Sequence, residues 1–389
     1  MKESNKKEIV FLTNHISYFA SHRLVIAEKL MRFGYNTRVI SGKKITDETR
    51  SLNLVKSKGV KVTSVKHLAG STKLISIIWL FLCVTMYCWG KKNIILHCVS
   101  TKSAIVGLAV GFITRTPVVL SLSGFGLFLH SETKTFRGNL KSMLVTYYFL
   151  FLSKFTTNRY IIQNNRDKAA LIRNFQIKEE NITLTLGSGV ILQDYKFEQT
   201  SKQNIVLMAS RLLNSKGVYE YISACKKLKK LYPNWNFVLA GDPDLDSPDC
   251  VNKQDLQLAL TNTGIEWVGH QINISSILET AKIFVLPSYY NEGFPKVLIE
   301  ASASGCAIIT TDLAGCRDAV NSGETGILIA PKDTNKLISA IQFFIDNQIE
   351  QSIFAKSAYE YAQNNFSITT VFEKYIEVYE SLAFSNHRL

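Results

Sequence analysis

Short apolar runs alternate with longer amphipathic stretches along the first half of the chain. The run Glu8–Thr13 predicts a strand, and the periodic stretch Phe19–Phe33 predicts a helix that ends at Gly34. Helical periodicity recurs between further runs, and these have the composition of strands: Tyr35–Ile40, Asn93–Cys98, Pro117–Leu122, Arg159–Gln163 and Ile182–Leu186. This alternation is typical of an α/β domain in which helices cover both faces of a parallel sheet.

The same alternation begins again near Asn204, after the polar stretch Gln193–Gln203. The strands predicted in this half are Asn204–Met208, Phe237–Ala240, Ile265–Val268, Ile283–Leu286, Ala307–Thr310 and Gly326–Ile329. A chain of 389 residues is long enough for two domains of ordinary size. We therefore expect one α/β domain over residues 1–192 and a second over residues 193–389.

Two predicted helices of the first domain are unusually apolar. Leu74–Trp89 contains no charged residue, and Leu140–Phe155 is rich in aromatic residues and contains no acid. A helix that spans a bilayer needs ~20 apolar residues, so neither is expected to span one. Each is interpreted either as a helix buried in the domain or as one that touches a membrane surface.

Charge is divided unevenly between the two halves. The net charge is +14, yet residues 1–190 contain 28 Lys or Arg and 9 Asp or Glu, whereas residues 191–389 contain 17 and 22. No Asp or Glu occurs from Thr49 to Ser131. A basic domain favours an anionic partner, such as a phospholipid surface or a lipid pyrophosphate. The alternative is a surface that serves solubility alone.

The cysteines and the N-terminus bear on location. The seven cysteines form no CxxC pair, which indicates a reduced, cytosolic protein without a disulfide framework or a zinc site. The apolar run Ile9–Leu12 is too short for the core of a signal peptide. A cytoplasmic location is therefore expected.

The segment from Phe284 to Gly305 has the pattern of a strand, a loop and a helix. Its loop contains Gly293 and Phe294, and Pro295 suits the first helical position because that position needs no amide hydrogen. The amides and the dipole of a helix N-terminus can hold phosphate, and a glycine lets an anion approach the backbone. This segment therefore predicts a phosphate site.

Two carboxylates accompany the predicted phosphate site. Glu292 is on the loop, and Glu300 is far enough into the helix to point back towards the same place. Carboxylates repel phosphates, but they accept hydrogen bonds from sugar hydroxyls. The pair favours a nucleotide sugar as the ligand; the alternative is two solvated surface glutamates.

A second basic constellation follows the strand Asn204–Met208. Arg211 and Lys216 fall on the loop between this strand and a helix that is predicted to start near Gly217. Ligands of parallel sheets bind at this carboxyl edge. A guanidinium and an ammonium together suit a pyrophosphate leaving group, although two solvated loop cations would give the same pattern. The nearby acids Asp242, Asp244 and Asp246 are interpreted as an exposed loop, so no metal site is predicted.

These residues resemble a known family. Glu292 and Glu300, eight positions apart around Gly-Phe-Pro, resemble the E-x7-E signature of family 4 glycosyltransferases, and Arg211 and Lys216 match its basic pair. Three further segments also look like the C-terminal domain of that family: Val238–Gly241, Val268–His270 and Ala303–Thr310. The resemblance is strong over Asn204–Lys332, and several motifs in the same order form a specific signal.

The resemblance implies the GT-B architecture, in which two Rossmann-like domains face each other across a cleft. It implies that a last helix, about residues 369–382, packs back on the first domain. It also implies a retaining transfer without a metal or cofactor, in which Arg211, Lys216 and helix amides stabilise the departing nucleoside diphosphate. Glu292 would hold hydroxyls of the donor sugar, Glu300 would hold the ribose, and Gly293, Phe294 and Pro295 would complete the donor site.

The first half resembles the family more weakly. Phe19–Leu24 looks like the first helix of members that build surface polysaccharides, so His22 and Arg23 are candidates for the acceptor side. Ser123 stands where many members have a histidine, and the loop Asn14–Tyr18 lacks the double glycine of many relatives. We expect a sugar to be transferred to a glycan acceptor linked to polyprenyl pyrophosphate, in O-antigen or capsule synthesis at the inner membrane face.

Two other functions are compatible with parts of this sequence. A nucleotide-sugar 2-epimerase on the same fold would need acid and base groups around the second carbon of the sugar, and the Glu292–Glu300 segment fits transfer better. A basic module that binds lipid or nucleic acid is a function of a different class. No helix-turn-helix, RNP-like or zinc-finger pattern occurs, so nucleic acid is not an expected partner.

Overall fold

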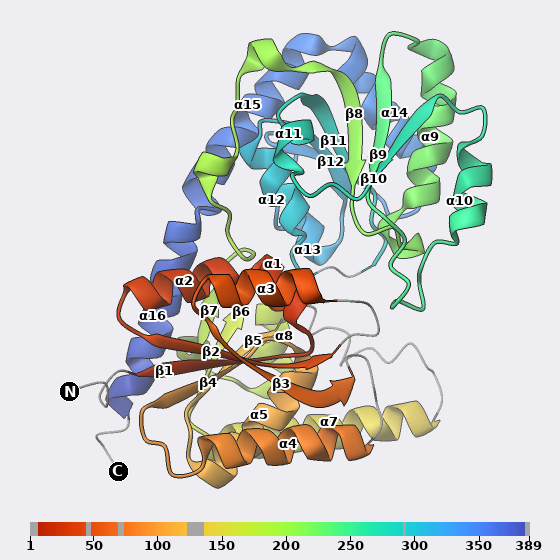
Figure 1. The fold of residues 1–389 in the computed structure, drawn as a ribbon. Helices are drawn as coiled ribbons and strands as arrows, with labels where there is room; N and C mark the ends of the chain where they lie inside the picture. The colour runs from red at the N-terminus through yellow and green to blue at the C-terminus, as the bar shows by residue number, and fades with distance from the viewer. Residues whose placement is uncertain (1–6, 44–47, 69–73, 123–135, 291–292, 386–389) are drawn as a thin grey trace. The chain divides into compact units, whose positions relative to one another are not determined.

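The structure is a computed structural model that describes residues 7–43, 48–68, 74–122, 136–290 and 293–385. The chain divides into two compact units (Figure 1). The first comprises Met1–Ser188 together with Val371–Leu389, and the second comprises Gly189–Thr370. The sequence analysis had placed the boundary between residues 192 and 193.

The first unit contains a parallel sheet with the strand order β3-β2-β1-β4-β5-β6-β7. The strands are β1 (Glu8–Thr13), β2 (Asn36–Lys43), β3 (Lys61–Leu68), β4 (Ile94–Cys98), β5 (Val118–Leu122), β6 (Asn158–Ile162) and β7 (Ile182–Leu184). The direction of winding reverses between β1 and β4. In open parallel sheets the carboxyl ends at such a reversal form the usual ligand-binding edge.

Helices cover both faces of this sheet. One face carries α1 (Ile16–His22), α2 (Leu24–Arg32) and α3 (Thr49–Ser57), and the other carries α4 (Leu74–Cys88), α5 (Thr101–Thr114) and α7 (Phe136–Phe155) (Figure 1). The core under the second face includes Val10, Leu96 and Leu120 of the sheet together with α8 (Asn165–Phe175). The C-terminal helix α16 (Ile368–Ser385) also joins this unit from Val371 onward.

The structure differs from the predicted elements of this unit in two places. The single helix predicted over Phe19–Phe33 is two helices, because Arg23 leaves the helical conformation (φ −129°, ψ −13°). The helix α3 and the strand β3 were not predicted. The β3 sequence KVTSVKHL is mostly polar and does not alternate strictly between apolar and polar residues, so it lacks the usual pattern of a strand, and β3 lies at the edge of the sheet.

The second unit contains a parallel sheet with the strand order β10-β9-β8-β11-β12-β13. The strands are β8 (Gln203–Ala209), β9 (Asn236–Ala240), β10 (Ile265–Gly269), β11 (Ala281–Leu286), β12 (Ala307–Thr311) and β13 (Gly326–Ile329). The helices are α9 (Val218–Leu231), α10 (Lys253–Leu260), α11 (Ser275–Leu278), α12 (Lys296–Ala303), α13 (Ala314–Arg317), α14 (Thr334–Asp346) and α15 (Gln348–Asn365). Every strand predicted for this unit is present, and the predicted α/β class with parallel sheets is confirmed for both units.

Candidate active site

The carboxyl edge of the second sheet brings the predicted donor residues onto adjacent loops. β8 and β11 are neighbours in the sheet. Arg211 and Lys216 follow β8, whereas Gly293, Phe294 and Pro295 follow β11 and lead into α12. Parallel strands carry all of these loops at the same edge, as the sequence analysis expected.

Hydrogen bonds fasten the two loops together at their base. The backbone amide of Tyr289, after β11, donates to the carbonyl of Ser215 at 2.8 Å, and the Ser288 hydroxyl donates to the same carbonyl at 3.1 Å. Gly217 begins α9 with φ at +78°, and a Cβ atom there would lie 2.3 Å from the carbonyl oxygen of Pro287. Only a glycine permits this contact, which fixes the position of the turn that carries Lys216.

Arg211 has a partner that the sequence analysis did not assign. One guanidinium nitrogen, Nη1, donates to Oδ2 of Asp244 at 2.7 Å, while the arginine side chain remains 66% exposed. Asp244 belongs to the loop after β9, the strand next to β8. Because a guanidinium has five N–H donors, the ion pair aims Arg211 and leaves further donors for a phosphate.

The start of α12 differs by one position from the prediction. Pro295 is in an extended conformation (ψ 113°) and precedes the helix, which begins at Lys296. Phe294 is buried, and its ring centroid lies 5.6 Å from that of Phe366. Both side chains anchor the loop, and the first amides of α12 remain at the carboxyl edge of the sheet, where they can hold an anion.

Glu300 is buried and has two partners. Its Oε1 accepts a hydrogen bond from the Tyr195 hydroxyl at 3.0 Å and lies 3.1 Å from the Lys296 ammonium. Burial, followed by the charge of Glu300, raises the pKa of Tyr195, so this phenol stays protonated and donates. The contacts orient the carboxylate, and Oε2 can accept from a ligand hydroxyl. The other predicted carboxylate, Glu292, lies outside the described residues.

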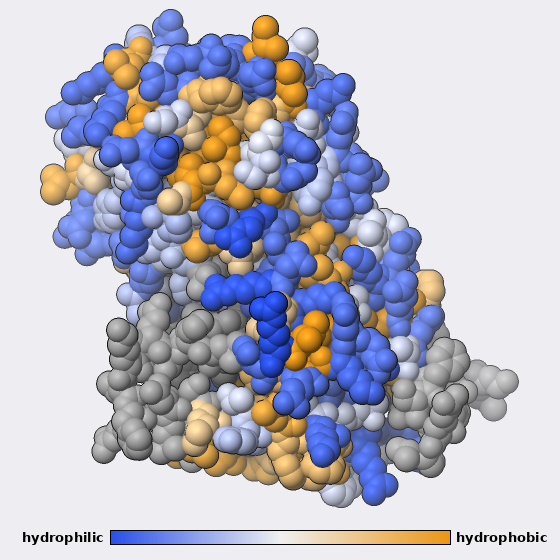
Figure 2. Space-filling view, turned by 180° about the vertical axis from the view of Figure 1, so that it is seen from behind, coloured by the Kyte–Doolittle hydropathy of each residue, from blue (hydrophilic) through white to orange (hydrophobic). Residues whose placement is uncertain are grey.

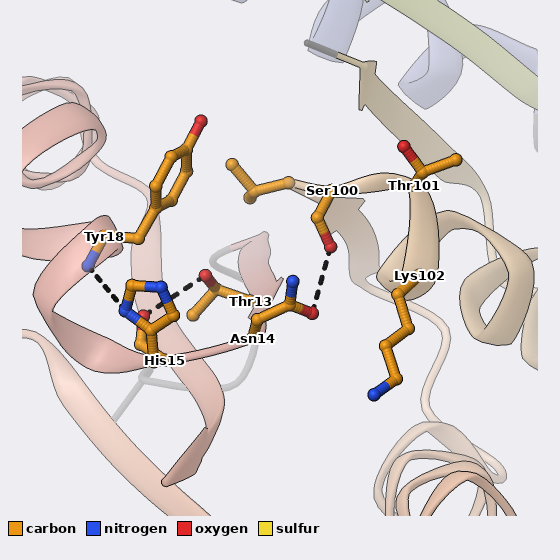
Figure 3. A pocket seen from close by; sticks show the side chains of 8 residues that line it. Thr13, Asn14, His15, Tyr18, Ser100, Thr101 and Lys102 are labelled. Carbon is orange, nitrogen blue, oxygen red and sulfur yellow. Dashed lines mark hydrogen bonds between the residues drawn. The ribbon is translucent and has the colours of Figure 1, made fainter. Parts of the chain in front are cut away.

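A pocket of about 330 Å³ opens at the carboxyl edge of the first sheet, where the winding reverses (Figure 3). It is lined by Thr13, Asn14, His15, Tyr18, Val99, Ser100, Thr101 and Lys102, which follow β1 and β4. The Ser100 hydroxyl donates to Oδ1 of Asn14 at 3.1 Å and thereby joins the two loops. Ser100 also caps the N-terminus of α5.

The lining of this pocket combines polar and cationic groups with apolar carbon surface. Burial lowers the pKa of Lys102. Nδ1 of His15 accepts from the amide of Tyr18 at 3.2 Å and lies 3.6 Å from a carboxylate oxygen of Glu48. The sequence analysis missed Ser100 and Lys102. Their signal was a polar sequence, Ser-Thr-Lys-Ser, at the junction of a buried strand with a helix.

The three acceptor-side candidates from the sequence do not line this pocket. His22 stacks on Tyr18 at a centroid distance of 4.4 Å. It therefore contacts a residue that lines the pocket but does not line the pocket itself. Arg23 is 2% exposed and is enclosed within the first unit, with Tyr375 and Tyr379 of α16 among its neighbours. The expectation that Arg23 contacts the acceptor is therefore wrong, and this buried side chain has a structural role. Ser123 lies outside the described residues.

A buried polar cluster surrounds Arg23. His97 of β4 is fully buried; its Nδ1 lies 2.6 Å from the Tyr379 hydroxyl, and its Nε2 lies 2.6 Å from the Ser121 hydroxyl. Burial, reinforced by the Arg23 charge, lowers the pKa of His97 well below its usual value, so the imidazole is neutral. These contacts hold α16 against the first sheet.

Neither a metal-binding cluster nor a membrane-spanning helix is found among the described residues. No group of three or more His, Cys, Asp or Glu side chains in the described ranges is placed to hold a metal ion. No helix of the described chain has the length and hydrophobicity needed to cross a bilayer.

Comparison with known proteins identifies the class of enzyme. Residues 193–361 match the family model for glycosyl transferases group 1. The protein is a glycosyltransferase. Solved structures with a similar fold include Anabaena HepE in complex with UDP, with a TM-score of 0.75 and 18% identity over 96% of this chain and 100% of that one. A sucrose-phosphate synthase from Thermosynechococcus elongatus gives a TM-score of 0.79 at 16% identity, over 98% and 100%. The fold is the GT-B fold.

Related sequences include two transferases named for undecaprenyl-diphosphate-linked acceptors and one named for capsular polysaccharide biosynthesis. The Campylobacter jejuni N,N'-diacetylbacillosaminyl-diphospho-undecaprenol alpha-1,3-N-acetylgalactosaminyltransferase is 28% identical over 72% of this chain and 74% of its own. An Escherichia coli UDP-Gal:alpha-D-GlcNAc-diphosphoundecaprenol alpha-1,3-galactosyltransferase is 27% identical over 74% and 76%. The Staphylococcus aureus capsular polysaccharide glycosyltransferase CapM is 24% identical over 75% and 77%.

Proposed function

We propose that this glycosyltransferase moves a sugar, with retention of configuration, from a nucleoside diphosphate sugar to a glycan linked to polyprenyl pyrophosphate. The proposed pathway is the synthesis of O-antigen or capsule at the cytoplasmic face of an anionic membrane. The observation that carries the proposal is the convergence of Arg211, Lys216 and the N-terminus of α12 on one edge of the second sheet. The names of the two relatives that act on undecaprenyl diphosphate acceptors support the choice of acceptor.

The donor chemistry follows from the charges at this edge. As the bond between the sugar and the diphosphate breaks, negative charge grows on the leaving phosphate. Arg211, Lys216 and the amides of α12 are arranged to stabilise that charge, which is the work that a metal does in other transferases. Glu300 would hold the ribose hydroxyls, Glu292 would hold hydroxyls of the donor sugar, and Gly293 would allow close approach of the phosphates.

On the acceptor side, the pocket between β1 and β4 suits the polar head of a lipid-linked glycan. Lys102 and the capped N-terminus of α5 supply positive charge, and Asn14 and Ser100 supply hydrogen-bonding groups. An isoprenoid chain would remain in the membrane while only the head group enters the pocket.

The deciding experiment supplies UDP- and GDP-sugars, with and without a polyprenyl-pyrophosphate-linked acceptor, and measures the release of nucleoside diphosphate and the anomeric configuration of the product. Release that depends on the acceptor, with retention of the anomeric configuration, is expected from wild type. Lys216→Ala is expected to lose this release, whereas the exposed Lys226→Ala of α9 keeps it. Conversion of one nucleotide sugar into another without any acceptor would contradict the proposal in favour of an epimerase.

A further inference from the structure

Two helices of the first unit expose long stripes of large apolar side chains. On α4 these are Ile75, Ile78, Trp79, Leu82 and Met86, and on α7 they are Leu144, Tyr147, Tyr148, Phe151 and Phe155. Both sets have the spacing i, i+3, i+4, i+7 and i+11, which follows one side of an α-helix. In most globular domains such a stripe faces the core, whereas both of these stripes face solvent.

The helix α5 lies between the two helices that carry the stripes. The helix α5 packs against both α4 and α7, and it exposes Phe112 and Ile113. The ring of Phe112 lies 6.3 Å from that of Phe151 and 6.4 Å from that of Phe155, centroid to centroid. We call this surface the α4–α5–α7 face; apolar side chains along the lower edge of the first unit are visible in Figure 2.

The exposed stripes do not result from poor packing of the helices. The opposite side of α4 buries Leu80 and Val84 in the core of the unit, and the opposite side of α7 buries Phe149 and Leu152. Each helix is therefore apolar on both sides. A contiguous apolar surface of this kind is rare on monomeric soluble proteins unless it binds something.

The charges around this face have one sign. The sequences of α4, α5 and α7 contain no Asp or Glu. Exposed cations stand where the three helices end: Lys91 and Lys92 follow α4, Arg115 follows α5, and Lys154 is in the last turn of α7. Because these ends all adjoin the amino edge of the sheet, the four cations form a row along one border of the face.

A basic depression of about 380 Å³ opens at the same amino edge. It is lined by Glu8, Asn36, Arg38, Lys61, Tyr87, Lys91, Lys92, Asn93 and Ile94. Glu8 is its only acid, and Nε of Arg38 lies 3.2 Å from that carboxylate. The Lys91 ammonium stands 3.4 Å from the centroid of the Tyr87 ring. Positive charge therefore continues from the border of the face into a concave site of a size that suits a phosphate head group.

We propose that the α4–α5–α7 face binds an anionic phospholipid leaflet. The apolar stripes enter the boundary between head groups and acyl chains, and the cation row and the basic depression contact lipid phosphates. This proposal rests on the membrane location proposed above and assigns it to a surface. Aromatic side chains such as Trp79 and Tyr147 are suited to that boundary, because they combine an apolar ring with a polar group.

Charge complementarity selects this occupant over a second copy of the chain. A symmetric dimer would place the same patch of both copies together. The charged border of this face is basic, and the acid of the adjoining depression, Glu8, is already paired with Arg38. A second copy would therefore offer this border little negative charge, whereas a leaflet of acidic phospholipids supplies it along the whole border.

Tryptophan fluorescence tests the contact directly. The protein has four tryptophans. Trp79 and Trp89 are exposed at α4, and Trp235 and Trp267 belong to the second unit. Vesicles of phosphatidylglycerol with brominated acyl chains are expected to quench wild-type emission, and the variant Trp79→Phe with Trp89→Phe should bind the vesicles without quenching. Quenching that persists in this variant, or none in wild type, would overturn the proposal.

Paired charge insertions provide a second test. Ile75→Glu with Ile78→Glu is expected to lower partition onto phosphatidylglycerol vesicles at least tenfold in a flotation assay. The matched control Ile349→Glu with Ile353→Glu changes equally exposed isoleucines on α15 and should float like wild type. Equal flotation of the two double variants would contradict the proposal. So would a result in which Ile75→Glu with Ile78→Glu floats normally but converts a dimer to a monomer in sedimentation velocity.

The same reasoning applies to the cations. Lys91→Glu with Lys92→Glu should weaken flotation, whereas the adjacent exposed pair Lys226→Glu with Lys227→Glu on α9 should not. The lipid assignment would be overturned if inorganic phosphate protects Lys91 and Lys92 from acylation while the variant Lys91→Glu with Lys92→Glu floats as well as wild type. That combination would indicate a site for a free anion. Every variant is also assayed on a short-chain, water-soluble acceptor. Normal turnover there separates a failure of docking from a failure of the proposed transferase chemistry.

Discussion

Glu300 is a buried carboxylate on α12, the helix whose N-terminus is proposed to hold phosphate. Tyr195 and Lys296 both contact its Oε1, so the charge is partly compensated before any ligand arrives. We expect Glu300→Ala to lower turnover at least 100-fold, or ~3 kcal/mol of barrier, because the variant loses its contact with the ribose. Steady-state rates at saturating acceptor provide the measurement.

The control for Glu300→Ala is Glu360→Ala on α15. Glu360 also pairs with a lysine four positions before it, Lys356, but this pair is exposed and neither residue is among the predicted donor residues. Its replacement is expected to leave turnover unchanged. A Glu300→Ala variant with nearly wild-type rate would refute the assignment of this residue to the donor site.

Arg211 and Lys216 also lead to a prediction about metals. If these side chains and the amides of α12 stabilise the leaving diphosphate, a divalent cation has no remaining task in the reaction. We expect turnover to be the same with EDTA as with magnesium or manganese. Activity that EDTA abolishes and either ion restores would contradict this prediction, and dialysis against EDTA before the assay excludes carried-over metal.

At the level of single residues, the positions of charged side chains were easier to predict from the sequence than the residues with which they pair. Arg211 and Lys216 were placed correctly after β8, because a basic pair between a strand and a helix is a local pattern. Asp244 was dismissed as part of an exposed loop, although it pairs with Arg211 across adjacent strands. Such a contact depends on sheet order, which a single sequence does not reveal.

The loop elements after β8 and β11 depend on one glycine, and a matched pair of variants tests this. Gly217 and Gly323 have similar φ angles, +78° and +84°, but only at Gly217 would a Cβ atom collide with other backbone. Gly323→Ala should cost ~1 kcal/mol of stability through its backbone angle alone. Gly217→Ala should cost a further ~1–3 kcal/mol through the clash with Pro287.

Thermal unfolding and donor affinity together test the role of Gly217. The shifted turn of Gly217→Ala should also displace Lys216, so donor affinity should fall in this variant and remain normal in Gly323→Ala. Equal melting temperatures for the two variants would show that the contact between Gly217 and Pro287 does not constrain the turn.

The attachment of α16 to the first sheet predicts a pH dependence. The low pKa of His97 keeps it neutral in the folded state, whereas in the unfolded chain it takes up a proton near pH 6.5. Below about pH 6.5 the unfolded state therefore binds the extra proton, and the free energy of unfolding falls by up to ~1.4 kcal/mol per pH unit. This loss continues down to the folded-state pKa.

The measurement is the melting temperature of wild type and His97→Gln between pH 7 and pH 5. Glutamine can hydrogen-bond to Tyr379 and Ser121 but does not titrate, so its melting temperature should fall less over this range. His270→Gln, at an exposed histidine of the second unit, should retain the wild-type slope. An unchanged slope in His97→Gln would assign the pH dependence to other groups.

At the level of elements, the parallel sheets were predictable and the surroundings of their helices were not. Buried strands such as Ile283–Leu286 are continuous apolar runs, which are easily recognised. Leu74–Trp89 was interpreted as either buried or membrane-facing, and α4 has both a buried and an exposed side. A uniformly apolar sequence contains no periodicity that could indicate which side is covered.

The charge division of the whole molecule leads to the final prediction. Residues 1–190 have a net charge of +19 and residues 191–389 of −5, so attraction to an anionic leaflet acts on the first unit. A basic side chain near such a leaflet gains ~1 kcal/mol, and the Debye length falls from ~10 Å at 0.1 M salt to ~3 Å at 1 M. Transfer to a lipid-linked acceptor in phosphatidylglycerol vesicles should therefore fall at least tenfold over this range of potassium chloride.

Two controls separate this membrane effect from an effect of salt on catalysis. Turnover on a short-chain, water-soluble acceptor should change little over the same salt range, because that reaction needs no leaflet. Transfer in vesicles of neutral phosphatidylcholine should be slow at low salt and insensitive to added salt. The membrane assignment fails, while the transferase assignment stands, if the protein does not float with anionic vesicles at low salt and the soluble acceptor is used as efficiently as the lipid-linked one.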